Sequence, residues 1–96
     1  ITNTGDTNTG IFFPAADKIA LSAGGTQRLT MAADGKVGLG TDDPTSFNSA
    51  ANQFVISAGG NTGLTIDSTS STSSSIFFAD GPTGTEAYRG YISYSR

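Results

Sequence analysis

The sequence predicts an all-β fold, and three observations support this class. Gly, Thr, Ser and Asn supply 44 of the 96 residues, whereas Glu occurs once and Lys twice, so side chains that favour helices are nearly missing. Apolar residues recur at every second position in short runs, as they do in strands with one buried face. Gly-rich reversals separate these runs. We therefore expect short strands joined by tight turns.

The first half of the chain has the pattern of a β-meander. Residues 1–10 are too polar to pack alone, and Pro14 ends the first apolar run, because proline cannot donate to a central strand ladder. Chain reversals are expected at Gly24-Gly25 and at Asp34-Gly35, which is a strong hairpin signal. The strands predicted from the apolar runs are 11–13, 19–21, 29–31 and 37–39.

The second half begins with a segment that has two interpretations. Asp43 followed by Pro44 is typical of a helix start, so residues 44–52 form either a short helix or an irregular connector. Residues 67–75 (DSTSSTSSS) are of low complexity and form either a solvated loop or a polar strand. The strands predicted in this half are 54–56, 64–66, 76–78 and 88–94.

The chain contains an internal repeat. Residues 19–31 (IALSAGGTQRLTM) match residues 54–66 (FVISAGGNTGLTI) at an offset of 35, with six of thirteen positions identical. A looser match relates 11–13 to 76–78. A repeated unit that cannot bury its own apolar face is typical of stacked, extended architectures. We therefore expect a fragment of a longer chain with three parts: a first β repeat unit (1–44), a connector (45–53) and a second β repeat unit (54–96).

The composition lacks the residues of most catalytic sites. No Cys and no His are present, which removes thiolate nucleophiles, zinc–cysteine sites and the usual general base. The acidic residues lie mostly in predicted turns, where Asp usually bonds to its own backbone. Five scattered cations and a net charge of −3 disfavour nucleic acid, and no apolar run is long enough to span a membrane. We therefore expect no enzyme, no catalytic residues, no metal or other cofactor, no nucleic-acid partner and no membrane insertion.

The apolar residues are too few to seal a core within one chain. Ile, Leu, Val and Phe total 19, and each strand offers about two of them to one face. Several chains wound about a common axis would cover these stripes and pair the strand edges. We expect a homotrimer, although residue counts alone do not fix threefold symmetry. The side chains expected in the trimer core are Ile19, Leu21, Leu29, Met31, Val37, Leu39, Phe54, Ile56, Leu64 and Ile66.

Two segments carry a resemblance to a known family. The run NTGIFFPAADKIALSAGGTQRLTMAADGKVGLGTDDP resembles the repeat unit of bacteriophage tail fibres, in which a strand ends in the motif G-x-V-G-[IL]-G-T-x-x-P, here Gly35 to Pro44. The segment SIFFADGPTGTEAYRGYISY resembles the block that follows this repeat in many such fibres. Together the two segments cover most of residues 8–94. Some bacterial surface fibres share the same repeats.

The resemblance implies an elongated, intertwined homotrimeric β fibre, of the triple β-helix or β-prism kind, that carries a host-recognition tip. It implies other virion tail proteins as partners, a host surface glycan or protein as receptor, and an extracellular place in the tail fibre of the virion. Full-length members often end in an autocleaving intramolecular chaperone, and nothing in these 96 residues matches it. A segment of a bacterial surface fibre or adhesin, located on the cell surface, is the alternative.

A second hypothesis makes the segment itself a receptor-binding module. Tyr88, Tyr91 and Tyr94 would stack on a carbohydrate, and neighbouring charged residues such as Arg89 would supply hydrogen bonds. The simpler interpretation is that Tyr88 and Tyr94 pack in the trimer core while Tyr91 lies on the surface, because Tyr is an ordinary strand residue.

Overall fold

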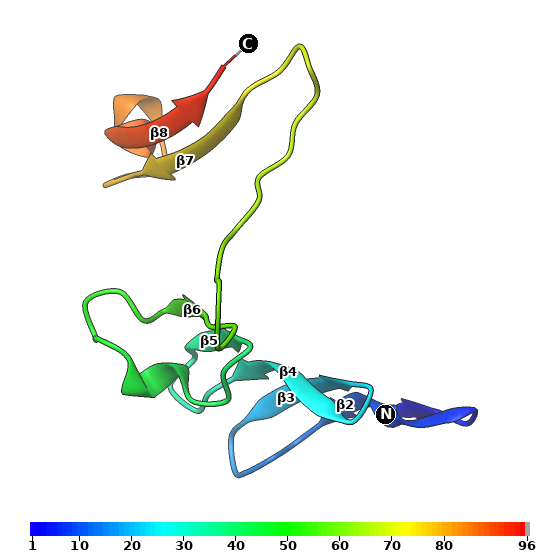
Figure 1. Cartoon of the computed structure of the whole chain (residues 1–96). Helices are drawn as coiled ribbons and strands as arrows, with labels where there is room; N and C mark the ends of the chain where they lie inside the picture. Colours follow the sequence, from blue (N-terminus) through cyan, green and yellow to red (C-terminus); the bar gives the residue numbers. More distant parts are fainter. Residues whose placement is uncertain (96) are drawn as a thin grey trace. The chain divides into compact units, whose positions relative to one another are not determined.

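The computed structural model describes residues 1–95 and is mostly β, as predicted (Figure 1). It contains eight strands and two short 3-10 helices, and residues 1–95 form no α-helix. The chain divides into two compact units, Ile1–Gly63 and Leu64–Arg96. This division reflects contacts, whereas the expected boundaries after residues 44 and 53 describe sequence repeats and stay a prediction.

The first unit is built on one six-stranded sheet. Neighbouring strands run antiparallel, except that the last two run parallel. The sheet contains strands at the predicted positions 19–21, 29–31, 37–39 and 54–56. The strand predicted at 11–13 instead runs from Asp6 to Phe12, so that the polar opening forms most of it and also the outermost hairpin. The strands, in their order across the sheet, are β1 (Thr2–Asn3), β2 (Asp6–Phe12), β3 (Ile19–Ala23), β4 (Thr26–Met31), β5 (Val37–Leu39) and β6 (Phe54–Ile56).

The connection from β5 to β6 covers one face of this sheet. Two parallel strands cannot be joined by a hairpin, so the chain must cross over a face of the sheet. The crossover begins at Gly40, whose φ is +86° and whose backbone lies so close to the Ser57 carbonyl that a Cβ would clash with it. It then forms a single 3-10 turn, η1 (Pro44–Ser46), with proline at the start. The alternative between a helix and a connector over 44–52 thus resolves into one helical turn followed by irregular chain.

Small side chains lie beneath the crossover. Ala20, Thr30, Gly38 and Val55 are directly opposed across four neighbouring strands, and all four are buried. A Cβ on Gly38 would meet the Thr41 carbonyl oxygen at 2.5 Å, which shows how closely the crossover approaches the sheet. The core of this unit therefore has little volume.

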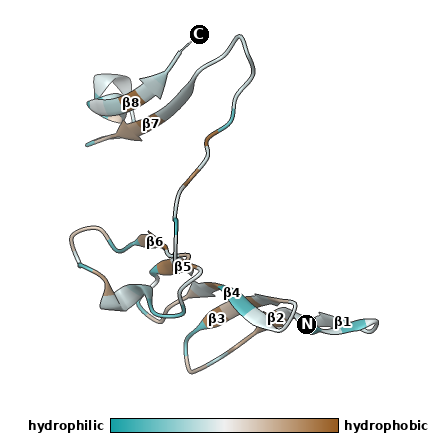
Figure 2. Cartoon of the chain, viewed as in Figure 1, coloured by the Kyte–Doolittle hydropathy of each residue, from teal (hydrophilic) through white to brown (hydrophobic). Residues whose placement is uncertain are grey.

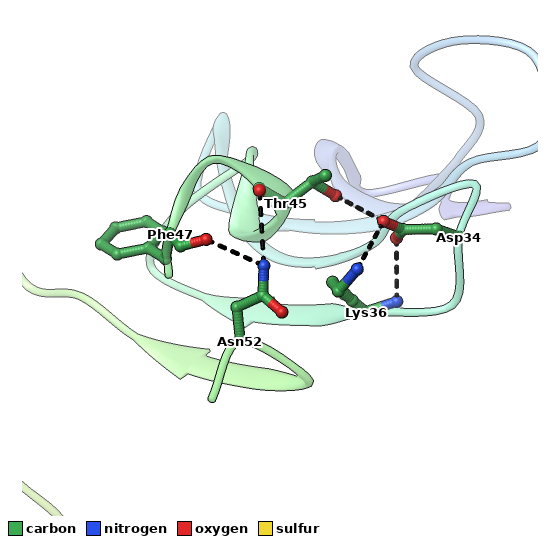
Figure 3. Close-up of polar contacts among 5 residues, drawn as sticks. All are labelled: Asp34, Lys36, Thr45, Phe47 and Asn52. Carbon is green, nitrogen blue, oxygen red and sulfur yellow. Dashed lines mark hydrogen bonds and ion pairs between the residues drawn. The ribbon is translucent and has the colours of Figure 1, made fainter. Parts of the chain in front are cut away.

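Polar contacts hold the crossover in place (Figure 3). The Asn52 side chain is almost fully buried, and its Nδ2 donates to the carbonyl oxygens of Thr45 (3.3 Å) and Phe47 (3.0 Å). Asp34 accepts hydrogen bonds from the Lys36 ammonium (3.0 Å) and the Thr45 hydroxyl (3.0 Å). The hydrogen bonds from the Lys36 side chain and backbone, with that from Thr45, lower the pKa of the Asp34 carboxyl. The turn after β4 is thus tied to the crossover.

The second unit is smaller and has a two-stranded antiparallel sheet. It consists of β7 (Ser74–Phe78), the 3-10 helix η2 (Gly84–Tyr88) and β8 (Gly90–Tyr94). The low-complexity run is a loop up to residue 73 and enters β7 only at its last two serines. The strand predicted from residue 88 begins at Gly90, because Tyr88 ends η2.

The strand predicted at 64–66 is wrong. Residues Leu64–Ile66 lie outside every strand and helix, and their apolar side chains are exposed, Leu64 by 66%. Alternating Leu-Thr-Ile has strand-forming character, but a strand also requires a partner for its backbone groups. Within residues 1–95 the segment has no such partner.

Candidate assembly surface

The face of the six-stranded sheet opposite the crossover gathers the apolar residues of the repeat. Directly opposed residues share a face, and strand residues alternate between faces. The pairings therefore place two rows of large side chains side by side, which we call the apolar face. Figure 2 shows the hydropathy of the strands along the chain. One row consists of Ile11, Leu21, Leu29, Leu39 and Ile56, and the other of Ile19, Met31, Val37 and Phe54.

Most of this apolar face is exposed in the single chain. Phe54 is 57% exposed, Met31 46% and Ile19 44%, whereas Leu29, Val37 and Ile56 are less exposed but not fully buried. On β3 to β6 the covered face of the same sheet carries Ala, Thr, Gly and Val, and on β2 this face carries Phe12, which is opposite Ala20. Most of the larger side chains thus lie on the uncovered face, the reverse of the arrangement expected in a monomeric soluble domain.

The apolar face is hollowed near its middle. A hollow of about 150 Å³ lies among the side chains of Ile19, Leu21, Leu29, Met31 and Val37. All of these side chains are uncharged, so a ligand in the hollow would meet a hydrocarbon surface. Such a surface favours apolar side chains of another protein chain.

Eight of the ten predicted core residues lie together on this face. The ninth residue of the two rows, Ile11, was not among the predicted core residues. Ile11 faces Leu21 across the β2–β3 pairing. Ile11 belongs to the run Ile11-Phe12-Phe13, in which apolar and polar residues do not alternate. Only the pairing of β2 with β3 therefore shows which face of the sheet it occupies. The two remaining predicted core residues, Leu64 and Ile66, belong to the second unit.

The second unit has its own exposed apolar surface. Ile76 on β7 faces Ile92 on β8, and Tyr94 lies two residues further along the same face. Together with Leu64 and Ile66 these side chains line a hollow of about 190 Å³. A two-stranded sheet is marginally stable in water unless something packs on it, so this surface also favours a covering partner.

An aromatic cluster occupies the opposite face of the β7–β8 pair. The Phe77 ring centroid lies 5.7 Å from that of Tyr88 and 6.3 Å from that of Tyr91, in tilted and edge-on arrangements. Both tyrosines are exposed, and Tyr94 lies on the other face. The structure thus brings together two of the three tyrosines of the carbohydrate hypothesis and adds Phe77, which the sequence reasoning had not assigned.

Polar groups surround this aromatic cluster. The hydroxyls of Ser75 and Ser93 lie 3.0 Å apart beside it, and a hollow of about 250 Å³ extends over the serines and the three rings. Arg89 donates to the Asp80 carboxylate at 3.0 Å in an exposed ion pair. Rings with adjacent hydroxyls are chemically suited to stacking against a sugar.

The acidic residues are not gathered into a metal site. Within residues 1–95 no group of three or more Asp and Glu side chains is placed to hold a metal ion. Asp6 accepts a hydrogen bond from the Asn8 backbone N–H at 3.3 Å, an Asx-type turn. No helix within the same residues is long and apolar enough to cross a membrane.

Comparisons of the chain with protein-family models, with curated proteins and with solved structures found no match. The apolar face, the exposed surface of the second unit and the aromatic cluster are therefore the physical basis on which a function is proposed.

Proposed function

We propose that this chain is a structural segment of a bacteriophage tail fibre, in which three copies associate through their apolar faces into a rigid shaft that supports attachment to the host. The apolar face carries the proposal, because five strands, β2 to β6, present large uncharged side chains with nothing over them. A mechanical role needs no catalytic group, and avidity arises when many identical fibres bind at once.

The energetics favour association over a free monomer. The fully buried side chains of the single chain are small or polar, the largest being Asn52, Thr30 and Pro44. Covering one large apolar side chain contributes roughly 1.5–3 kcal/mol, and the apolar face offers nine of them. A domain of this size has a net stability of only about 5–15 kcal/mol, so burial of this face would dominate the balance.

The tail-fibre motif has a local structural role that agrees with the proposal. Its glycines at 38 and 40 allow the crossover to approach the sheet, and its proline begins η1. The motif thereby covers one face of the sheet and leaves the other free for neighbouring copies. A bacterial surface fibre would use the same geometry, and the genes adjacent to the coding sequence distinguish the two settings.

Small-angle X-ray scattering of the purified chain tests the proposal. We expect a forward-scattering mass of three chains, of 9.7 kDa each, and a cross-section profile typical of a rod. A particle with the mass of one chain would contradict the proposal. A trimer of globular shape would support association but contradict the shaft.

The aromatic cluster favours a second candidate function, carbohydrate binding by the segment itself. A glycan array probed with the wild-type chain and with a Tyr91→Ala variant tests it. Tyr91 is 62% exposed and does not belong to the apolar face, so its loss should not affect association. Glycan binding that is lost in the variant supports this candidate. If the wild type binds no glycan, carbohydrate binding is contradicted and only the shaft role is left.

A further inference from the structure

The two copies of the internal repeat have different conformations. In the first copy, β3 and β4 form an antiparallel hairpin in which Ile19 faces Met31 and Leu21 faces Leu29. Both turn glycines, Gly24 and Gly25, have positive φ, at +61° and +83°. These values match a type I′ turn, which closes a two-residue hairpin. The first copy is therefore a complete β-hairpin.

The second copy keeps only the first arm of this hairpin. Phe54 and Ile56, the equivalents of Ile19 and Leu21, lie in β6, whereas Leu64 and Ile66 lie outside any strand. At the turn, Gly59 has a φ of +76°, but Gly60 is not in the left-handed region. A type I′ turn needs positive φ at both positions, so the chain does not reverse here as it does in the first copy.

A threonine side chain closes the second turn instead. The Thr62 hydroxyl donates to the Gly60 carbonyl at 2.9 Å and accepts from the Ala58 N–H at 3.3 Å. The first copy has Gln27 at the equivalent position. The turn of the second copy therefore lacks the geometry that closes the hairpin of the first copy.

The edge of β6 opposite β5 has the backbone geometry to pair with a further strand. Val37 N–H donates to the Gln53 carbonyl and Ser57 N–H donates to the Leu39 carbonyl, each at 2.9 Å. The backbone groups of odd-numbered residues thus face β5, and those of Phe54 and Ile56 point to the other edge, because alternate strand residues bond to opposite sides. Within residues 1–95, β6 is the last strand of its sheet on that edge.

We infer that the free edge of β6 receives the Leu64–Ile66 arm of a neighbouring copy of the chain. The repeat sets the register: Phe54 faces Ile66 and Ile56 faces Leu64, as Ile19 faces Met31 and Leu21 faces Leu29 in the first copy. Each copy lends one arm and receives another, so the two apolar rows of the sheet each gain a side chain. The inference rests on the proposed assembly and adds which strands the copies exchange.

Cysteine cross-linking tests the exchange, because the chain has no cysteine of its own. Directly opposed residues in an antiparallel hydrogen-bonded pair have Cα atoms about 5.5 Å apart, within the range that a disulfide spans. Two differently tagged full-length chains, one with Ile56→Cys and one with Leu64→Cys, are co-expressed, purified through both tags and oxidised. A disulfide between the two tagged chains can form only between copies.

We expect a covalent species with the mass of two chains that is lost on reduction. The matched control replaces Leu64→Cys with Thr65→Cys, one residue out of register, which points the thiol to the other face and should give much less product. A Leu21→Cys/Leu29→Cys chain serves as a positive control and should close within one chain.

The outcomes separate this inference from the proposed function. If the doubly tagged oligomer is recovered but no in-register disulfide forms, the strand exchange is wrong and the assembly stands. If an Ile56→Cys/Leu64→Cys chain cross-links only within itself, the second hairpin closes internally and the exchange is again wrong. If no doubly tagged oligomer is recovered at all, the proposed assembly is contradicted together with the exchange.

Discussion

Replacing Leu29 with Asp places a carboxylate at the centre of the apolar face. Leu29 faces Leu21 on β3 and Leu39 on β5, so apolar side chains flank it on both neighbouring strands. It also lines the hollow of about 150 Å³ in which we expect a partner's side chain. A charge at this position therefore meets no compensating group within its own chain.

Two terms set the size of the effect. The loss of a covered leucine costs about 1.5–3 kcal/mol, and an unpaired carboxylate removed from water costs several kcal/mol more. Both costs recur in every copy of a symmetric assembly. We therefore expect Leu29→Asp to shift the assembly fully to monomer at concentrations where the wild type is associated.

Sedimentation velocity at pH 7 measures this shift, with two matched variants as controls. Leu29→Asn removes the leucine without adding charge and should weaken association less. Ala50→Asp adds the same charge at an exposed position of the crossover and should leave the sedimentation coefficient unchanged. A Leu29→Asp chain that sediments like the wild type would refute the idea that this face is buried between copies.

Three further predictions concern the crossover. Asp34→Asn should lower the melting temperature at pH 7, and the difference from the wild type should shrink as the pH falls below the ordinary Asp pKa. The reason is that the lowered pKa of Asp34 stabilises the fold when the pH is above the ordinary value, and this stability is lost as the pH falls through the lowered pKa. Asn52→Ala should cost about 1–3 kcal/mol in chemical denaturation, because it removes both hydrogen bonds that this buried side chain donates to the crossover, whereas the exposed Asn48→Ala should cost much less. Gly40→Ala adds a backbone clash to an unfavourable φ and should destabilise the fold more than Gly59→Ala, which has a similar φ but open space around it; equal melting temperatures would contradict this.

Three central strands of the first unit were predictable because their signals are local. Alternation at 19–21, 29–31 and 37–39, with glycine at each reversal, requires no knowledge of the rest of the chain, and the structure has strands at all three places. The same alternation made eight residues candidates for one surface. Their pairings place them on one face of a single sheet.

The failures come from features that local patterns do not encode. Leu64 and Ile66 alternate as well as Leu29 and Met31 do, but a strand needs a partner, and the partner depends on the turn geometry at Gly60. Phe77 joins Tyr88 and Tyr91 because η2 returns the chain to β7, a tertiary contact that residue spacing does not reveal. The parallel pairing of β5 with β6, which determines the covered face, is also non-local.

Sedimentation equilibrium of the unmodified chain tests the central claim most directly, because mass is measured without regard to shape. If the apolar faces of three copies cover one another, the mass should be three times the 9.7 kDa of one chain over a wide range of concentration. A folded chain that remains at 9.7 kDa at high concentration would contradict the account, because its apolar face would then be stable in water.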